Sequence, residues 1–208
     1  KNRPADRKPT IQFDAEGVCS ACRFAERKAT GIDWKAREKE LLALCDRFRS
    51  KDGRYDCIVP GSGGKDSSFT AHQLKYKYGM NPLTVTWTPN AYTEVGFRNL
   101  QAWIHSGFDN YLCSPNGKVH RLLTRLAFEN LCHPFQPFII GQRLVGPRFS
   151  AMFGVPLVFY GENQAEYGND VAENDRPTMD PRFFYDAKPD LDALALGGVP
   201  ARKLLEDG

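Results

Sequence analysis

The sequence lacks the features that mark membrane proteins, secreted proteins and nucleic-acid-binding proteins. No apolar run in its 208 residues approaches the roughly 20 residues that span a bilayer, and no signal-peptide pattern opens the chain. The net charge is only +3, and no block of lysine and arginine is dense enough to indicate a nucleic-acid surface. We therefore expect a cytoplasmic protein with no membrane span and no nucleic-acid partner.

The six cysteines lack the regular spacing of a disulfide framework. In a chain of this length they indicate reduced thiols or metal ligands. Charged residues make up 25% and hydrophobic residues 41% of the chain, which is ordinary for a globular protein. The length is enough for one sizeable core with a small appendage.

Two common phosphate-binding motifs are missing from the most glycine-rich loop of the chain. A Walker A motif would need glycine at Val59 and a hydroxyl residue at Asp66. The glycine pattern of dinucleotide-binding folds fails as well, because its third glycine position is Asp66. The loop is therefore not of either common type.

What the loop does contain indicates a different anion site. The β-branched run Cys57-Ile58-Val59-Pro60 predicts a strand, and residues 67–78 predict a helix. The run Gly61-Ser62-Gly63-Gly64-Lys65-Asp66-Ser67-Ser68 connects the strand to the helix and includes the first two helical residues. Backbone N–H groups and the helix N-terminus would face an anion, and the glycines would let the backbone approach it closely. Lys65 adds a positive charge, the serines add hydroxyl donors, and Asp66 is a candidate Mg²⁺ ligand. The alternative is a turn that only connects the strand to the helix.

Strand and helix patterns alternate along the rest of the chain. We expect strands at residues 55–60, 83–88, 109–113 and 156–160, and helices at 34–49, 67–78, 93–106, from 116 or 117 onward, and at 138–153. Such alternation predicts an α/β fold with a parallel sheet and right-handed crossovers. Trp87 and Thr88 end a strand, where adenine could bind, although Trp87 could equally be a core residue.

Other candidate residues lie outside the loop. Cys19-Ser20-Ala21-Cys22 follows a turn and has the form of half a zinc site, which Cys113, Cys132 or His133, or cysteines upstream of Lys1, would complete; the alternative is two small buried thiols. Arg143 and Arg148 on the 138–153 helix are either surface residues or contacts for a phosphorylated substrate. We expect His120 to be exposed.

Ser62-Gly63-Gly64-Lys65-Asp66-Ser67 resembles the loop of the PP-loop ATP pyrophosphatases. That resemblance implies ATP and Mg²⁺, with Ser62, Gly63, Gly64, Lys65, Asp66, Ser67, Trp87 and Thr88 binding the nucleotide and Lys65 and Asp66 acting in catalysis. The segment from Ile11 to Cys22 and the run Phe159-Tyr160-Gly161-Glu162-Asn163 further resemble the N-acetyl sugar amidotransferases of lipopolysaccharide and flagellin-glycan biosynthesis.

This second resemblance implies an ATP-dependent conversion of a sugar acetamido group to an acetamidino group. The sugar would be nucleotide-linked and would contact Gly161, Glu162, Asn163, Arg143 and Arg148, and a separate glutaminase partner would supply ammonia. A zinc-ribbon-like region would include Cys19 and Cys22. The alternatives are a tRNA-modifying PP-loop enzyme, which the net charge supports poorly, and a non-catalytic nucleotide-binding protein.

We expect three regions along the chain. Residues 1–32 would form an N-terminal extended or zinc-knuckle segment, residues 33–168 the PP-loop ATP pyrophosphatase domain, and residues 169–208 the start of a C-terminal region that continues beyond Gly208. Because the chain begins at Lys1, we also expect a preceding N-terminal piece. The sequence is compatible with an oligomer.

Overall fold

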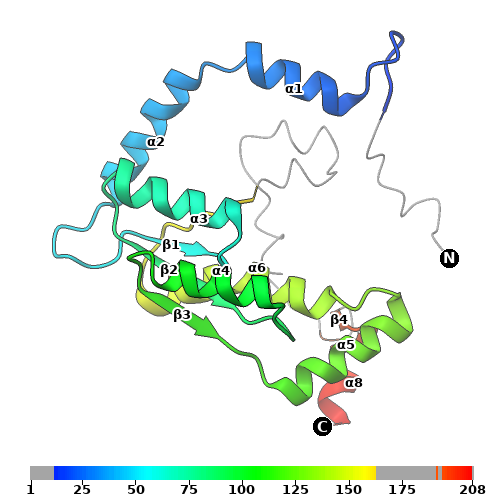
Figure 1. Ribbon diagram of the computed structural model, residues 1–208. Coiled ribbons are helices and arrows are strands. Elements are labelled where there is room, and N and C mark those ends of the chain that lie inside the picture. Colours follow the sequence, from blue (N-terminus) through cyan, green and yellow to red (C-terminus); the bar gives the residue numbers. More distant parts are fainter. Residues whose placement is uncertain (1–11, 163–190, 192–193, 208) are drawn as a thin grey trace. The chain divides into compact units, whose positions relative to one another are not determined.

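The computed structural model describes residues 12–162, Leu191 and residues 194–207, and the chain divides into two compact units (Figure 1). Of the described residues, 12–47 and Glu162 belong to the first unit, and 48–161, Leu191 and 194–207 belong to the second. Among these residues no helix has the length and apolar character needed to cross a bilayer.

The first unit begins with a tight turn that leads into a helix. Phe13 and Cys19 form an antiparallel bridge, and the Asp14 carboxylate accepts hydrogen bonds from the backbone N–H groups of Glu16 and Val18 inside the turn. Helix α1 spans Ser20–Thr30, with Cys19 as its N-cap residue. Helix α2 spans Trp34–Phe48, which confirms the predicted helix at 34–49. Asp33 accepts a hydrogen bond from the Ala36 N–H and so caps α2.

The second unit is built on a parallel sheet, as the strand–helix alternation predicted. Strands β1 (Cys57–Pro60), β2 (Pro82–Trp87) and β3 (Asn110–Cys113) lie in the order β1-β2-β3. The predicted strand at 156–160 is reduced to a single parallel bridge between Ile58 and Val158, on the edge of β1 away from β2. The unit is thus a mixed α/β structure, compatible with a Rossmann-like fold.

Helices connect these strands. Helix α3 (Lys65–His72) continues into a π-helix, η2 (Gln73–Lys77), and follows β1; α4 (Glu94–Ile104) follows β2. Helices α5 (Gly117–Leu131) and α6 (Gln136–Phe153) follow β3 and return the chain to the far side of β1. Successive strands are thus added on one side of β1 and then, with the bridge at Val158, on its other side. Ligands of open α/β sheets bind where the strand order reverses in this way.

The core lies between the sheet and α6. Ile58, Leu83 and Val85 are fully buried and pack with Val145 and Phe149 of α6. The alternate residues Thr84 and Thr86 are also fully buried, and both hydroxyls accept hydrogen bonds from the Asn110 side-chain amide, so their polar atoms are satisfied.

A short C-terminal segment completes the described part of this unit. Strands β4 (Ala195–Leu196) and β5 (Val199–Pro200) form an antiparallel hairpin, followed by helix α8 (Ala201–Glu206). The Gly197 carbonyl accepts a hydrogen bond from Asn130 of α5, and the Gly197 N–H donates to Gln136 of α6. The hairpin is therefore tied to both helices.

A buried carboxylate joins the loops that precede β1 and β2. Asp56 is 4% exposed and accepts hydrogen bonds from the backbone N–H groups of Ser50, at 2.5 Å, and Asn81, at 2.6 Å. Hydrogen bonds to a buried ionised group stabilise more than neutral ones, and removing the carboxylate would leave two N–H groups without their partner.

We predict that Asp56→Ala lowers the free energy of unfolding by about 2–3 kcal/mol, measured by urea denaturation. The matched control is Asp52→Ala, which removes an exposed ion pair with Arg54 and should cost less than about 1 kcal/mol. Equal losses in the two variants would contradict this role of Asp56.

Candidate functional site

The glycine-rich loop runs from the carboxyl end of β1 to the N-terminus of α3. The Gly61 N–H donates to the Val85 carbonyl at 2.9 Å, so the loop leaves the sheet only after this residue. Gly63 has a φ of +83°, and a Cβ at this position would overlap the backbone carbonyl of Asn99 in α4. Both the dihedral angle and the packing therefore require glycine at position 63.

The first turn of α3 is packed against a distant part of the chain. A Cβ on Gly161 would lie 2.5 Å from the Ser67 nitrogen and 2.6 Å from the Asp66 carbonyl carbon. Gly161 follows the segment whose Val158 bridges to Ile58 of β1, and this bridge holds the segment next to the sheet. The structure thus brings together two sequence-predicted groups, the loop and Gly161.

The N-terminus of α3 has the features of an anion site. Its N-cap residue, Gly64, has no side chain to bond the first-turn N–H groups, which have no partner within a helix. The helix also begins at Lys65, two residues earlier than predicted, because polar residues are tolerated in a first turn. Backbone donors, the helix dipole and the Lys65 side chain therefore lie at the same place.

Lys65 and Asp66 are both accessible. The Lys65 Nζ lies 2.7 Å from the Asp66 Oδ1, with 88% and 40% of the two side chains exposed. Exposed ion pairs of this kind contribute little to stability, so either side chain can turn to a ligand at small cost.

Of the other predicted residues, Ser62 lies in the loop, Thr88 follows β2 and Arg143 lies in α6. Thr88 Oγ1 lies 2.9 Å from Ser114 Oγ at the ends of β2 and β3. The Arg143 backbone carbonyl accepts a hydrogen bond from the Tyr160 hydroxyl. Ser62 and Glu162 are exposed, and Asn163 lies outside the described residues.

Cys19 and Cys22 form a thiol pair at the start of α1. Their Sγ atoms are 3.4 Å apart, and the Cys19 Sγ accepts a hydrogen bond from the Cys22 N–H. Backbone hydrogen bonds, first from Cys22, lower the pKa of the Cys19 thiol, and the hydrogen bond with Cys19 raises the pKa of Cys22. Cys22 is exposed and Cys19 is half-buried, so the alternative of two buried thiols is wrong.

Tetrahedral zinc, with its sulfur ligands about 2.3 Å from the metal, places two sulfurs about 3.8 Å apart, so the two thiols would have to separate slightly to bind one zinc ion. Within the described residues, however, no three His, Cys, Asp or Glu side chains gather into a metal-binding group. Zinc binding by Cys19 and Cys22 stays a prediction.

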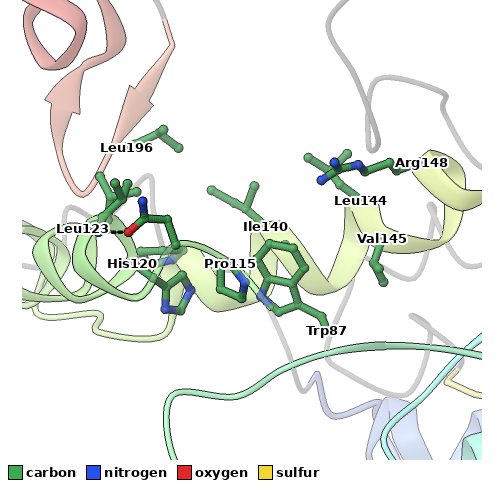
Figure 2. A pocket seen from close by; sticks show the side chains of 13 residues that line it. Trp87, Pro115, His120, Leu123, Ile140, Leu144, Val145, Arg148 and Leu196 are labelled. Atoms are coloured by element: carbon green, nitrogen blue, oxygen red, sulfur yellow. Dashed lines mark hydrogen bonds between the residues drawn. The ribbon is translucent and has the colours of Figure 1, made fainter. Parts of the chain in front are cut away.

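A pocket of about 360 Å³ lies between α5, α6 and the end of β2 (Figure 2). Most of its lining is apolar. The lining residues are Trp87, Pro115, Asn116, Val119, His120, Leu123, Pro137, Ile140, Gly141, Leu144, Val145, Arg148 and Leu196. Trp87 and Arg148, predicted for different ligands, therefore border the same pocket.

The expectation that His120 is exposed is wrong, since its side chain is only 5% exposed. Its Nδ1 contacts the side-chain oxygen of Asn90, and its ring meets Trp87 edge to face at 6.3 Å. A signal was present in the sequence, because His120 precedes Leu123 by three residues and Ala127 by seven, on the apolar side of α5.

Two residues that line this pocket each have a buried polar atom without a hydrogen-bond partner. These atoms are the buried Nε2 of His120 and the buried Nε1 of Trp87. Leaving such a group unpaired costs about 1–3 kcal/mol, so native structures seldom keep two of them together without a reason. Gly141 packs so closely on Trp87 that a Cβ would overlap the indole, which holds the ring in place.

Burial lowers the pKa of His120 below its ordinary value of 6.5. The folded protein therefore favours the neutral imidazole. In this form one ring nitrogen carries a proton and the other accepts a hydrogen bond.

Comparison with known proteins gives little information about function. No protein-family model matches the chain. An uncharacterized protein of Methanocaldococcus jannaschii is 30% identical over 78 residues, which cover 38% of this chain and 27% of that protein. The chain thus matches only a minor part of this relative's length, and the match shows neither a family nor an activity.

We predict that Gly63→Ala lowers the free energy of unfolding by more than about 1 kcal/mol, because alanine disfavours the left-handed conformation and its Cβ would strike α4. Gly64→Ala is the matched control, since Gly64 has a negative φ and a Cβ there would meet nothing within 4 Å. Denaturant unfolding measures both, and a control that loses as much as Gly63→Ala would argue against the packing described here.

The lowered pKa of His120 also predicts a pH dependence of stability. Well above pH 6.5 the residue is neutral in both folded and unfolded chains and has no effect on stability. As the pH falls below that value, the unfolded chain binds a proton that the folded chain does not, so the free energy of unfolding decreases. His120→Gln should lose this part of the acid sensitivity, measured by denaturant unfolding at about pH 7.5 and 5.5. An unchanged or steeper loss in the variant would contradict a neutral buried His120.

Proposed function

We propose that the chain is an ATP pyrophosphatase of the PP-loop type that acts as an N-acetyl sugar amidotransferase. The observation that supports this most is the loop from Gly61 to Ser67. The loop leaves β1 at the point where the strand order reverses and leads into α3. The side chains of Lys65 and Asp66 are accessible there. The sequence of the loop is the one on which the resemblance to PP-loop enzymes rests.

The loop suits a pyrophosphate group. The first-turn N–H groups of α3 would donate to the β- and γ-phosphate oxygens of ATP, and Lys65 would add a charge-assisted contact. Asp66 would hold Mg²⁺, which neutralises charge on the phosphates. The resemblance implies that such a loop retains pyrophosphate, so the bond that breaks would lie between the α- and β-phosphates.

The proposed reaction then follows from the chemistry of an acetamide. Its oxygen is a poor leaving group, so it must be activated before nitrogen can replace it. The acetamide oxygen attacks the α-phosphorus and pyrophosphate leaves, which gives an O-adenylated imidate. Ammonia adds to the imidate carbon, and AMP departs with the former acetamide oxygen, leaving an acetamidino group. The protein supplies positioning and electrostatic stabilisation, and no covalent nucleophile is needed.

The finer parts of this proposal rest on the resemblance to the amidotransferases. The sugar would be nucleotide-linked and would contact Gly161, which lies against α3, together with Glu162, Asn163, Arg143 and Arg148. A glutaminase partner would supply ammonia. Cys19 and Cys22 would belong to a zinc-ribbon-like region.

The test is turnover of ATP with a panel of nucleotide-linked N-acetyl sugars and ammonium, followed by phosphorus NMR. We predict AMP and pyrophosphate as products, only when both sugar and ammonium are present. Lys65→Ala should abolish turnover while its melting temperature stays within a few degrees of the parent, because its side chain is exposed. Lys51→Ala, which changes an exposed lysine before β1, should remain active.

Two results would overturn the proposal. ADP and orthophosphate as products would show cleavage at the wrong bond. Pyrophosphate release that responds to tRNA and not to any sugar would favour a tRNA-modifying enzyme.

A further inference from the structure

We propose that the pocket between α5, α6 and the end of β2 binds an elongated apolar molecule that ends in one carboxylate, such as a medium-chain acyl carboxylate. The apolar chain lies along α6, and the carboxylate meets Arg148. This inference does not depend on the reaction proposed above, because its ligand is neither ATP nor a sugar and its test needs no turnover.

The pocket has the form of a slot between two helices. The residues that α6 contributes recur at helical spacing along one stripe; they are Pro137, Ile140, Gly141, Leu144, Val145 and Arg148. From its first to its last residue this stripe is about 16 Å long, at the rise of an α-helix. Helix α5 and its N-cap contribute a shorter stripe of the same spacing, from Asn116 to Leu123. A volume of about 360 Å³ that follows such stripes suits one long, narrow ligand.

The walls of the slot are apolar where a ligand can reach them. Val119 and Leu144, which line it from the two helices, are 51% and 40% exposed, so a ligand would remove apolar surface from water. The Nε2 atom of His120 and the Nε1 atom of Trp87 are buried and out of a ligand's reach. The side-chain oxygen of Asn116 already accepts hydrogen bonds from the first turn of α5. The slot therefore favours an apolar molecule over a sugar.

A positive charge marks one end of the slot. Figure 2 shows Arg148 beside Leu144 at one end of the lining, with Leu123 and Leu196 at the other. Arg148 is exposed and, within the described part of the chain, has no ion pair. None of the described residues that line the slot is an aspartate or a glutamate. An anionic group is thus the partner that this end of the slot lacks.

A single arginine fits a carboxylate better than a phosphate. A guanidinium binds a carboxylate through two parallel hydrogen bonds, and the two unit charges cancel. A phosphate monoester carries nearly two negative charges at neutral pH. The described lining offers no second cation, since burial lowers the pKa of His120 and keeps its ring neutral. We therefore assign the carboxylate to the end of the slot at Arg148.

Indole N–H signals of the intact, nitrogen-labelled chain measure binding directly, because Trp87 lines the slot. Trp87→Phe and Trp34→Phe assign the signals of the three tryptophans. We expect decanoate to shift the Trp87 signal in a saturable way and to bind about fivefold more tightly than decanol, which has the chain without the charge. Acetate, which has the charge without the chain, should cause no shift. Trp34, in the first unit, and Trp103, which does not line the slot, serve as internal controls.

Two pairs of variants separate the charge from the chain. Arg148→Gln should weaken decanoate about fivefold and leave decanol unchanged, so that the two bind equally. Arg121→Gln, which changes an exposed arginine of α5 outside the lining, should bind both as the parent chain does. Leu144→Gln should weaken both ligands, because it places an amide on the apolar wall. Leu131→Gln, which changes a leucine of similar exposure outside the lining, should weaken neither.

The proposal fails if decanoate leaves the Trp87 signal unchanged at millimolar concentration, or if decanol binds the parent chain as tightly. It also fails if Arg148→Gln retains the preference for decanoate, or if Leu144→Gln binds both ligands as the parent does. Decyl phosphate that binds more tightly than decanoate would overturn the choice of a carboxylate. All four substituted side chains are exposed, and the comparison of decanoate with decanol needs only the parent chain.

Discussion

The close approach of backbone to backbone around the first turn of α3 is the constraint on which the candidate site depends. Gly63 passes against the backbone of α4, and Gly161 passes against Asp66 and Ser67. A side chain at either position would push the loop away from β1 or displace the N-terminus of α3. Because both contacts leave no space for a side chain, the first turn of α3 packs directly on neighbouring backbone without any ligand, and such packing favours electrostatic preorganisation.

The parallel sheet brings these groups to one edge. β1 ends at the loop, β2 ends at Trp87, and the segment beside β1 ends at Gly161. The Gly61–Ser67 loop and the α5–α6 pocket therefore belong to the same unit and begin from neighbouring strands.

Much of the fold could be predicted because its signals are local. A β-branched run predicts β2. The N-cap residues Thr93 and Asn116 predict where α4 and α5 begin. The predicted strand at 156–160 shrank to one bridge, since its pairing depends on β1, a distant part of the chain. The burial of His120 had a local signal, its place on the apolar side of α5, but its partners did not: Asn90 lies 30 residues away, and the neighbouring indole comes from β2. The pocket depends on such distant contacts, so no local pattern indicates it.

The central claim, that this chain activates an acetamide through its oxygen, can be tested by following that oxygen. A nucleotide-linked N-acetyl sugar labelled with heavy oxygen in the acetamido group is turned over with ATP and ammonium, and the products are analysed by mass spectrometry. The account predicts that AMP carries the label and that pyrophosphate and the acetamidino sugar carry none, because the acetamide oxygen leaves with the adenylate. Label that remains in the sugar, or that appears in orthophosphate, would contradict it.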